Sequence, residues 1–466
     1  MLLWTILPTA LALAPVQDFR VPSMARVVSK SGIQAARPLA QDAPANHVSK
    51  QASGPQVSLG ESVLPLWTDS ANSIYYINSS VGSQDSDGTS FPLLLDTGSG
   101  ISWIMNESCS DKACSNAAKF QKSIVSGSSF SLSYSGSNVE GKMVDTIEND
   151  LQVTIGNKLR LTNYSFGLAS TAPSFFEDFH ISGILGVQAS YSGNEQSNLI
   201  HQLYQAGDID AMQFAVLLDG ASNINSTLKG VFITGNDASR HANKLATSEV
   251  KYCDVLPNDQ HFWMVNISSV SYKQNFAINA SRGAIIDTGT TGMALPLKDA
   301  EALHKAAFGT DYVSDQKGNF AFKCNATGNF AFNISGNKFE VPVSQIRASP
   351  YEATVLQGYC ASKLQGTSES TSWILGASFL NPFYTIFDLQ NARVGFAPRV
   401  DSFQILSANT LSNSNSSSSS STSTSNTSSG APSNQSTSPP KQHSGAAFIS
   451  HSGSIVILCL LSILLV

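Results

Sequence analysis

Two segments of the chain place an aspartate at the end of a short apolar run, followed at once by a turn. Asp96 follows 93–95 and opens an Asp-Thr-Gly-Ser sequence, and Asp287 follows 284–286 and opens Asp-Thr-Gly-Thr. The glycine frees the backbone for a tight bend. Two carboxyl groups about 3 Å apart cannot both ionise, so such a pair shares one proton. One group can then take a proton from water while the other polarises a peptide carbonyl, which is the chemistry of peptide hydrolysis at acid pH.

A second element recurs at nearly the same distance from each aspartate. Ile184 begins an Ile-Leu-Gly sequence 88 residues after Asp96, and Ile374 begins another 87 residues after Asp287. Two elements that repeat in the same order at similar spacing predict two homologous lobes. The two aspartates would then lie at corresponding positions of the two lobes.

The remaining pattern favours β-structure. Apolar or alternating stretches at 130–134, 214–218, 230–234 and 393–397 are separated by Gly, Asn and Ser turns. Only two helices are expected, at 197–205 with Ser197 as N-cap and at 297–308. We therefore expect an all-β fold with few short helices, in which an active-site cleft lies between two lobes.

The composition excludes several classes of protein. The 466 residues carry a formal charge of −6, with 13% charged and 42% hydrophobic side chains. A nucleic-acid-binding protein normally has a basic surface, so nucleic acid is not an expected partner. No Cys-x-x-Cys sequence occurs and the eight histidines show no ligand spacing, so neither a metal nor another cofactor is expected. A glycosidase could use paired carboxylates, but it would not explain the twin Asp-Thr-Gly turns.

Further residues around these turns make the pattern specific. Trp103 follows the first turn, Tyr134 lies in a Leu-Ser-Tyr sequence with Gly141 downstream, and 373–376 reads Trp-Ile-Leu-Gly. With these features, residues 70 to 400 resemble the pepsin-type aspartic proteases (family A1), which have a bilobal fold. The resemblance implies an aspartic endopeptidase that acts on proteins or peptides as a monomer. A catalytically inactive binding or inhibitory protein of the same fold is the alternative.

The resemblance also assigns roles to individual residues. Asp96 and Asp287 are the catalytic dyad, and Tyr134 is the flap tyrosine whose hydroxyl reaches Trp103. Thr97 and Thr288 are expected to lock the two loops together. The remaining expected support and substrate-binding residues are Gly98, Ser99, Gly289, Thr290, Phe175 and Thr291. Asn325 stands where a second flap tyrosine would stand, so only one lobe should carry a flap.

Substrate preference stays open at this point. Phe175 occupies the position of an aromatic wall of the pocket for the residue before the scissile bond, and Glu177 and Asp178 follow it. If these carboxylates face the pocket, basic residues are favoured there. If they face solvent, the preference is hydrophobic.

The cysteines fit an oxidising compartment. Cys109 and Cys114 bracket four residues, which makes a small-loop disulfide possible, and the resemblance implies pairing of Cys324 with Cys360. Cys253 has no evident partner and is expected as a buried thiol. Asn-x-Ser/Thr sequences in the catalytic region offer N-glycosylation sites at Asn78, Asn106, Asn163, Asn225, Asn266, Asn279, Asn325 and Asn333.

The two ends of the chain predict export and membrane attachment. Residues 1–14 are apolar and end in small residues, as a signal peptide does. A terminal apolar tail preceded by small residues around Ser444 and a spacer forms a signal for a glycosylphosphatidylinositol (GPI) anchor. Ser407 to Ser438 contains 16 Ser and 5 Thr, a composition typical of an O-glycosylated stalk. Together with the protease pattern, these ends resemble the yapsin-like cell-surface proteases of fungi.

These observations predict six segments and a location. The expected product is secreted and held at the plasma membrane or cell wall by its anchor. The segments are a signal peptide at 1–14, a pro-segment at 15–70, an N-terminal lobe at 71–235, a C-terminal lobe at 236–400, a stalk at 401–443 and an anchor signal at 444–466.

Overall fold

The fold is described from a computed structural model. The residues that it describes are 54–69, 73–83, 88–121, 127–134, 137–189, 197–222, 225, 227–273, 275–315, 317–351, 356–367, 372–407 and 456–458. The expected signal peptide, most of the stalk and the proposed attachment residue Ser444 lie outside these residues.

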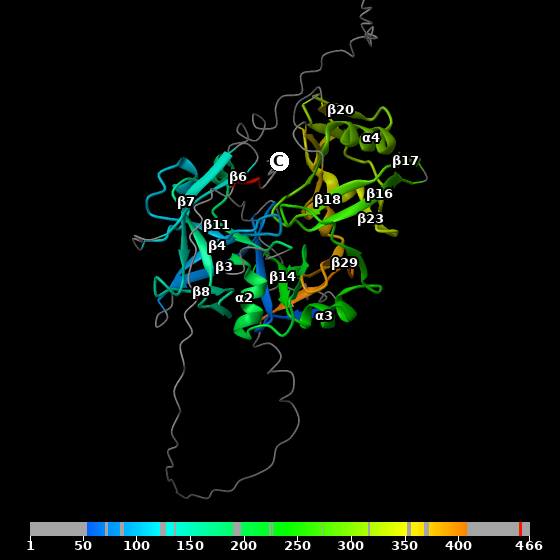
Figure 1. Cartoon of the computed structure of the whole chain (residues 1–466). Coiled ribbons are helices and arrows are strands. Elements are labelled where there is room, and N and C mark those ends of the chain that lie inside the picture. The colour runs from blue at the N-terminus through cyan, green and yellow to red at the C-terminus, as the bar shows by residue number, and fades with distance from the viewer. Residues whose placement is uncertain are drawn as a thin grey trace, which may run out of the picture.

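Within the described residues, the chain forms two lobes of mainly β-structure with few short helices, as the sequence predicts (Figure 1). A 16-stranded sheet runs from the join between the lobes through the N-terminal lobe. Its strands, in spatial order, are β15 (Lys251–Asp254), β29 (Arg393–Pro398), β28 (Phe383–Asp388), β12 (Gln213–Leu217), β14 (Leu228–Thr234), β2 (Val63–Thr68), β3 (Tyr75–Gly82), β4 (Thr89–Asp96), β11 (Gly183–Gly186), β5 (Trp103–Met105), β10 (Ser165–Ala169), β7 (Ser137–Asp145), β6 (Ser129–Tyr134) and β31 (Val456–Leu458), with β8 (Gln152–Ile155) and β9 (Leu159–Leu161) at the side.

The C-terminal lobe has its own sheets. The 8-stranded one contains β23 (Asn337–Pro342), β22 (Asn329–Ile334), β16 (Met264–Tyr272), β18 (Arg282–Ile286), β27 (Trp373–Leu375), β19 (Met293–Pro296) and β26 (Leu364–Thr367), with β17 (Asn275–Ile278) paired to β16. A 4-stranded sheet contains β20 (Tyr312–Ser314), β21 (Phe320–Lys323), β25 (Tyr359–Ser362) and β24 (Arg347–Pro350).

Short helices cover the edges of these sheets. In the described residues they are η1 (Lys112–Cys114), η2 (Ser174–Asp178), α2 (Leu199–Ala206), α3 (Asp237–Leu245), α4 (Leu297–Phe308), α5 (Val343–Ile346) and α6 (Ala377–Leu380). The helix expected at 297–308 has those bounds. The helix expected from 197 begins later, because the Asn198 side chain, and not that of Ser197, caps it by accepting from His201 N–H at 2.9 Å.

The register of two strand pairs explains the repeated sequence elements. In the N-terminal lobe β11 pairs in parallel with β4, so that Gly186 lies opposite Asp96. In the C-terminal lobe β27 pairs in parallel with β18, so that Leu375 lies opposite Ile286. Each Ile-Leu-Gly sequence therefore flanks the strand that delivers an aspartate, which is why its spacing from the aspartate is nearly constant.

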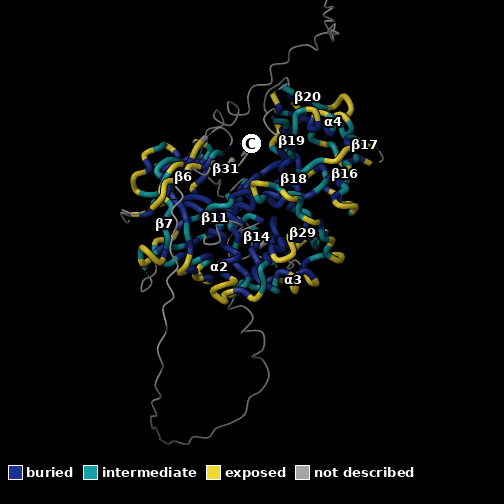
Figure 2. Tube along the Cα trace, in the orientation of Figure 1, coloured by how far each residue is buried: buried dark blue, intermediate teal, exposed yellow. Residues whose placement is uncertain are grey.

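The two lobes are joined through backbone pairing. β12 comes from the first half of the chain and pairs with β28 near its end, with Phe214 opposite Phe387. Their rings stack at 4.7 Å between centroids, and the indole of Trp263 meets both rings edge-on. Figure 2 shows buried residues running continuously from one lobe into the other. Burial of apolar side chains on this shared sheet fixes the relative position of the lobes.

Parts of two expected segments belong to the folded body. The segment expected as pro-segment, 15–70, contributes β1 (Gln56–Ser58) and β2 to the folded body, with Leu64 and Leu66 fully buried. The first residues of the expected stalk are also folded, since Phe403 and Ile405 are buried and β30 (Gln404–Leu406) pairs with β1. A small sheet of β1, β30 and β13 (Ala221–Ser222) thus closes both ends of the catalytic body.

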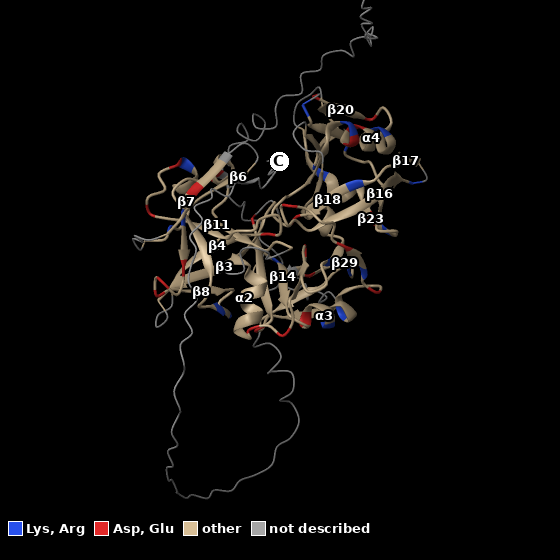
Figure 3. Cartoon of the chain, viewed as in Figure 1, with Lys and Arg blue, Asp and Glu red and all other residues tan. Residues whose placement is uncertain are grey.

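The C-terminal tail is described only at β31, which pairs in parallel with 131–133 of β6. Across the described part of the chain, we find no helix with the length and apolar character needed to cross a membrane. Charged residues are sparse and scattered over both lobes (Figure 3). This distribution agrees with the low charged fraction of the sequence.

Candidate active site

The two aspartates lie at corresponding positions in the two lobes. Asp96 ends β4 and is fully buried, while Asp287 directly follows β18 and is 2% exposed. Gly98 N–H donates to Asp96 Oδ1 at 2.8 Å, and the Ser99 hydroxyl donates to Oδ2. The second carboxyl group has equivalent donors, Gly289 N–H to Asp287 Oδ1 at 2.8 Å and Thr290 Oγ1 to Asp287 Oδ2 at 2.6 Å.

A reciprocal set of hydrogen bonds holds the two turns together. Thr97 N–H donates to Thr288 Oγ1 at 3.1 Å, and Thr288 N–H donates to Thr97 Oγ1 at 3.0 Å. The two hydroxyls donate in turn to Ile286 O at 2.8 Å and to Leu95 O at 2.7 Å. These four buried bonds cross between the lobes. Because each bond allows little variation in length, the four bonds together fix the distance between the two carboxyl groups.

The two turns leave no room for a side chain at their glycines. A Cβ added at Gly289 would lie 2.6 Å from Asp96 Cγ and Oδ1, and one at Gly98 would lie 3.0 Å from Asp287 Cγ. Each turn therefore packs its bare backbone against the carboxyl group of the other lobe. This explains why a glycine stands third in both sequences.

Burial and mutual repulsion shift the titration of the pair. Burial raises the pKa of Asp96 well above its usual range, and the adjacent Asp287 carboxylate raises it further. Burial likewise raises the pKa of Asp287. Because the two groups are hydrogen-bonded to each other, their titration belongs to the pair. The arrangement keeps one proton between two carboxyl groups, as acid–base catalysis on a bound water requires.

An aromatic cluster lies in the N-terminal lobe, around the expected flap tyrosine. Tyr134, at the end of β6, accepts a hydrogen bond from Trp103 Nε1 at 2.9 Å, and both side chains are buried. Phe176 in η2 is also fully buried, with its ring centroid 5.2 Å from that of Trp103. Phe175 is only half-buried and packs on Phe176 at 4.8 Å. The inner residue of the pair is thus Phe176, which the sequence did not single out.

Comparison with known proteins decides which family has this site. A sequence profile described as "Eukaryotic aspartyl protease" matches residues 74–399, most of the chain. The chain belongs to the eukaryotic aspartyl protease family. It is similar to an aspartic protease of Phaffia rhodozyma, with 29% identity over 76% of this chain and 81% of the relative. It is also similar to human gastricsin, with 29% identity over 66% of this chain and 77% of the relative.

A third relative is the "Aspartic-type endopeptidase ctsD" of Aspergillus fumigatus, 27% identical over 70% of this chain and 65% of its own length. The chain is an aspartic-type endopeptidase of the pepsin type and a protein of the secretory pathway. Its substrates are proteins or peptides.

Several residues of the protease support the site from a distance. Thr291 is almost completely buried, and its hydroxyl donates to Ser73 O at 2.5 Å across the lobes, so the described contact is structural. In the C-terminal lobe Arg282 donates to both carboxylate oxygens of Asp299, at 2.6 and 3.0 Å. Trp373 Nε1 also donates to Asp299, at 2.9 Å. This cluster ties β18, which leads to Asp287, to β27.

Sequence reasoning missed the Arg282–Asp299–Trp373 cluster. Trp373 was noted only as part of a signature, and Arg282 and Asp299 lie in different elements, β18 and α4. The sequence offers one indication of the cluster: a tryptophan and an aspartate each need a hydrogen-bond partner when they are buried. That signal does not say which residues meet.

The disulfides of the protease are those that the resemblance implied. Cys109 is bonded to Cys114, and Cys324 is bonded to Cys360. Cys253 is buried as a free thiol, and burial raises its pKa to about 11. The described residues contain no group of three His, Cys, Asp or Glu side chains placed to hold a metal ion.

The expected glycosylation sites differ in exposure. Asn163, Asn225, Asn279 and Asn325 are exposed. Those that are half-buried are Asn78, Asn106, Asn266 and Asn333.

The close approach at Gly289 gives a first prediction. Gly289→Ala forces a methyl group against the Asp96 carboxyl, and we expect kcat/KM to fall about 100-fold, the cost of a displacement near 1 Å in a catalytic pair. Gly60→Ala is the matched control, since a Cβ there meets nothing within 4 Å. Steady-state cleavage of a peptide substrate, with circular dichroism to verify folding, measures the effect. Equal turnover by the two variants would contradict the packing described.

The raised pKa of the dyad gives a second prediction, for stability. The pKa of Asp96 is higher in the folded protein than in the unfolded chain. The free energy of unfolding therefore falls as the pH rises from the unfolded pKa to the folded pKa. Asp96→Asn removes that cost, so the Tm of the variant should exceed that of the wild type by several degrees at neutral pH. The difference should shrink as the pH falls toward the unfolded carboxyl pKa of about 3.9, because a raised folded pKa carries no cost in stability below that value.

Scanning fluorimetry at one fixed, rapid scan rate measures the second prediction. Asp401→Asn, which alters an exposed carboxylate, should give no such pH-dependent difference. A Tm difference that stayed constant with pH in Asp96→Asn would refute the origin given for it.

Proposed function

We propose that the protease hydrolyses peptide bonds at acid pH through Asp96 and Asp287, as an enzyme attached to the cell surface. The observation that carries the catalytic part is the buried, hydrogen-bonded carboxyl pair with matched donors on both sides. One carboxylate takes a proton from a water molecule between the pair, and the protonated partner polarises the scissile carbonyl. A tetrahedral intermediate forms without a covalent bond to the enzyme, and return of a proton to the amine releases the products.

The described contacts of the carboxyl pair and of Tyr134 favour an active enzyme over an inactive binding protein. Both carboxyl groups, all four loop-to-loop hydrogen bonds and the Tyr134–Trp103 contact are present. An inactive relative has no need to keep this combination, in which each part serves the same reaction.

The proposed preference before the scissile bond is hydrophobic. Glu177, which could have made the neighbouring pocket acidic, forms an ion pair with Lys112 of η1. Lys112 is 81% exposed and Glu177 27% exposed, so the pair lies toward solvent. The buried side chains around Tyr134 are apolar, among them Phe176 and Ile184. The side chain of Asp178 lies outside the described residues.

The proposed pro-segment is shorter than residues 15–70. Because β1 and β2 belong to the folded body, the removable part ends before about residue 54. Its basic residues, among them Arg20, Arg26 and Lys30, suit a segment that pairs with an acidic cleft and leaves when acid protonates its partners. No Lys-Arg pair precedes the folded body, which favours self-cleavage.

Attachment to the cell surface is proposed from the C-terminal sequence. The stalk would begin after residue 407, and small residues around Ser444 would accept the GPI anchor before an apolar tail that is removed. A yapsin-like enzyme of this kind acts outside the cell, near the membrane or wall.

The catalytic proposal is tested with dyad variants of the full chain. Asp96→Asn and Asp287→Asn should each abolish cleavage of a denatured protein at about pH 4, because an amide cannot take and return a proton. The same variants, purified alone, should keep their full leader, whereas the wild type should trim itself. N-terminal sequencing and peptide release are the measurements. Residual turnover comparable to that of the wild type in either variant would be incompatible with the mechanism.

Substrate preference is tested at Lys112. Lys112→Met leaves Glu177 uncompensated, and we expect cleavage after Lys or Arg to rise relative to cleavage after Leu or Phe by up to about fivefold, the scale of an exposed ion pair. Lys158→Met, which breaks a comparable exposed pair with Glu61, is the control. Profiling with a peptide library measures the ratio. A wild type that already prefers basic residues would exclude the hydrophobic assignment.

Anchoring is tested by truncation. Removal of 444–466 should release active enzyme into the medium, because the anchor signal is separate from the catalytic body. A chain that lacks 408–438 but keeps its end should remain bound to cells and should be released by a phospholipase specific for phosphatidylinositol. Truncated protein that stays on cells after a salt wash would contradict the anchor.

A further inference from the structure

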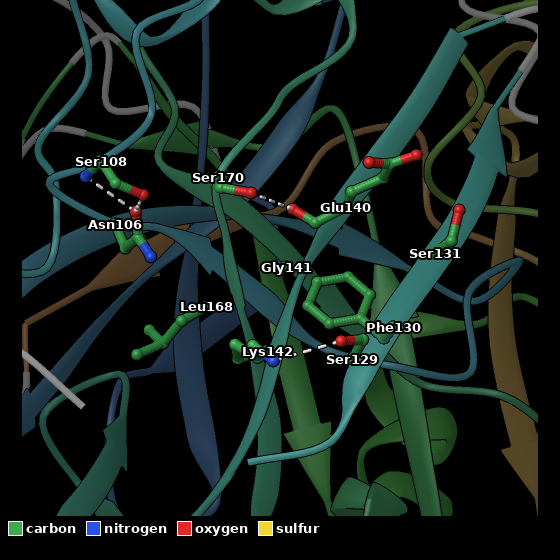
Figure 4. Close-up of a pocket in the computed structure, with 10 residues that line it drawn as sticks. All are labelled: Asn106, Ser108, Ser129, Phe130, Ser131, Glu140, Gly141, Lys142, Leu168 and Ser170. Carbon is green, nitrogen blue, oxygen red and sulfur yellow. Dashed lines mark hydrogen bonds between the residues drawn. The ribbon is translucent and has the colours of Figure 1, made fainter. Parts of the chain in front are cut away.

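A cavity away from the dyad opens at the base of the flap hairpin. Its volume is about 530 Å³, within the ~300–1,000 Å³ of sites that hold small organic ligands. Strands β6, β7 and β10 and the loop after β5 enclose it, and no dyad or loop-locking residue lines it (Figure 4). The lining residues that matter here are Asn106, Phe130, Glu140, Lys142, Leu168 and Ser170.

One wall of the cavity is the ring of Phe130, which packs directly against the backbone of two glycines. A Cβ at Gly141 would lie 2.8 Å from Phe130 Cε1, and one at Gly167 would lie 2.7 Å from both Cε1 and Cζ. The two glycines of β7 and β10 therefore let the ring lie flat against the sheet. Figure 4 shows this ring between Gly141 and Ser129, with Leu168 on the other side of the view. Exposed Glu140 and Lys142 supply charged groups at the rim.

Asn106 is held so that one atom stays available. Its backbone N–H donates to Ala169 O at 3.0 Å, and its carbonyl accepts from Cys109 N–H at 3.1 Å. Its side-chain Oδ1 accepts from both the N–H and the hydroxyl of Ser108, at 2.9 and 2.6 Å. These bonds orient the amide, and Figure 4 shows Nδ2 turned away from Ser108. Nδ2 is the atom that N-glycosylation modifies, and Ser108 is the hydroxyl residue of that Asn-Glu-Ser sequence.

We propose that Asn106 carries an N-linked glycan whose first N-acetylglucosamine lies in this cavity. In the secretory pathway a lipid-linked oligosaccharyl diphosphate is the donor. Asn106 Nδ2 bonds to the anomeric carbon, the bond from that carbon to the diphosphate oxygen breaks, Nδ2 loses a proton and the diphosphate leaves. The sugar lies against the exposed part of the Phe130 ring, and its hydroxyl and acetamide groups meet Glu140 and Ser170.

The docked sugar connects the flap to the body of the lobe. Asn106 lies on the loop after β5, whereas Phe130 and Glu140 lie on β6 and β7, the two strands of the flap hairpin that carries Tyr134. A rigid ring between them restrains the base of the hairpin. The glycan is therefore a brace for the flap, in addition to a surface modification.

A second site of the same local geometry serves as the control. Asn225 Oδ1 accepts from Thr227 N–H at 2.9 Å and from its hydroxyl at 2.8 Å, the same turn as at Asn106. Asn225 is exposed and does not line this cavity. A sugar attached to Asn106 would therefore lie in the cavity, whereas a sugar attached to Asn225 would lie in solvent.

The first test uses the full chain secreted from a glycosylating eukaryotic host. Glycopeptide mass spectrometry should find Asn106 occupied. Peptide:N-glycosidase F on the folded protein should release the Asn106 glycan about tenfold more slowly than that of Asn225, a ratio on the scale of one buried polar contact. After denaturation the two should be released equally. An unoccupied Asn106, or equal release from the folded protein, would overturn the proposal.

The second test measures the brace by amide hydrogen exchange over 129–143. Asn106→Gln and Ser108→Ala both remove the glycan and should speed exchange there severalfold, while Ser108→Thr keeps the glycan and the wild-type rate. Trimming with an endoglycosidase that leaves one N-acetylglucosamine should also keep that rate. Unchanged exchange in both glycan-free variants would refute the brace. No readout here is proteolysis, so failure of the catalytic proposal would be seen separately.

Discussion

The constraint on which the rest of the structure depends is that two buried carboxyl groups must lie close enough to share a proton. Neither lobe can meet it alone, because each supplies one aspartate. Burial opposes the arrangement and raises the pKa of both Asp96 and Asp287, and the adjacent carboxylate raises that of Asp96 further. The pair therefore persists only because hydrogen bonds and packing elsewhere hold the lobes together.

The reciprocal threonine bonds are the nearest part of that support. Thr97 and Thr288 each use an N–H and a hydroxyl to bond the other lobe. Farther out, the shared sheet through β12 and β28 and the stacked rings of Phe214 and Phe387 set the position of whole lobes. The support is thus layered, from hydrogen bonds at the dyad to apolar burial at the join.

The two lobes share a frame but differ in what covers the site. Both deliver their aspartate from a strand flanked in parallel by an Ile-Leu-Gly strand. The N-terminal lobe carries the Tyr134–Trp103 contact and the cavity at the base of the flap hairpin. In the C-terminal lobe, the Arg282–Asp299 ion pair stabilises β18. A repeated frame can therefore support an asymmetric site.

The sequence by itself determined the two lobes and the β-class and predicted the carboxyl pair, because these follow from local patterns repeated at fixed spacing. A strand, a turn and a returning strand are short-range features, and Asp96 and Asp287 are visible within them. Only the tertiary structure decided that Phe176 lies inside Phe175, that Asn198 caps α2, and that Lys112 pairs with Glu177. It also moved 56–68 and 404–406 into the folded body. Such contacts join segments far apart in the chain, and their partners are selected by packing, which no local pattern of residues specifies.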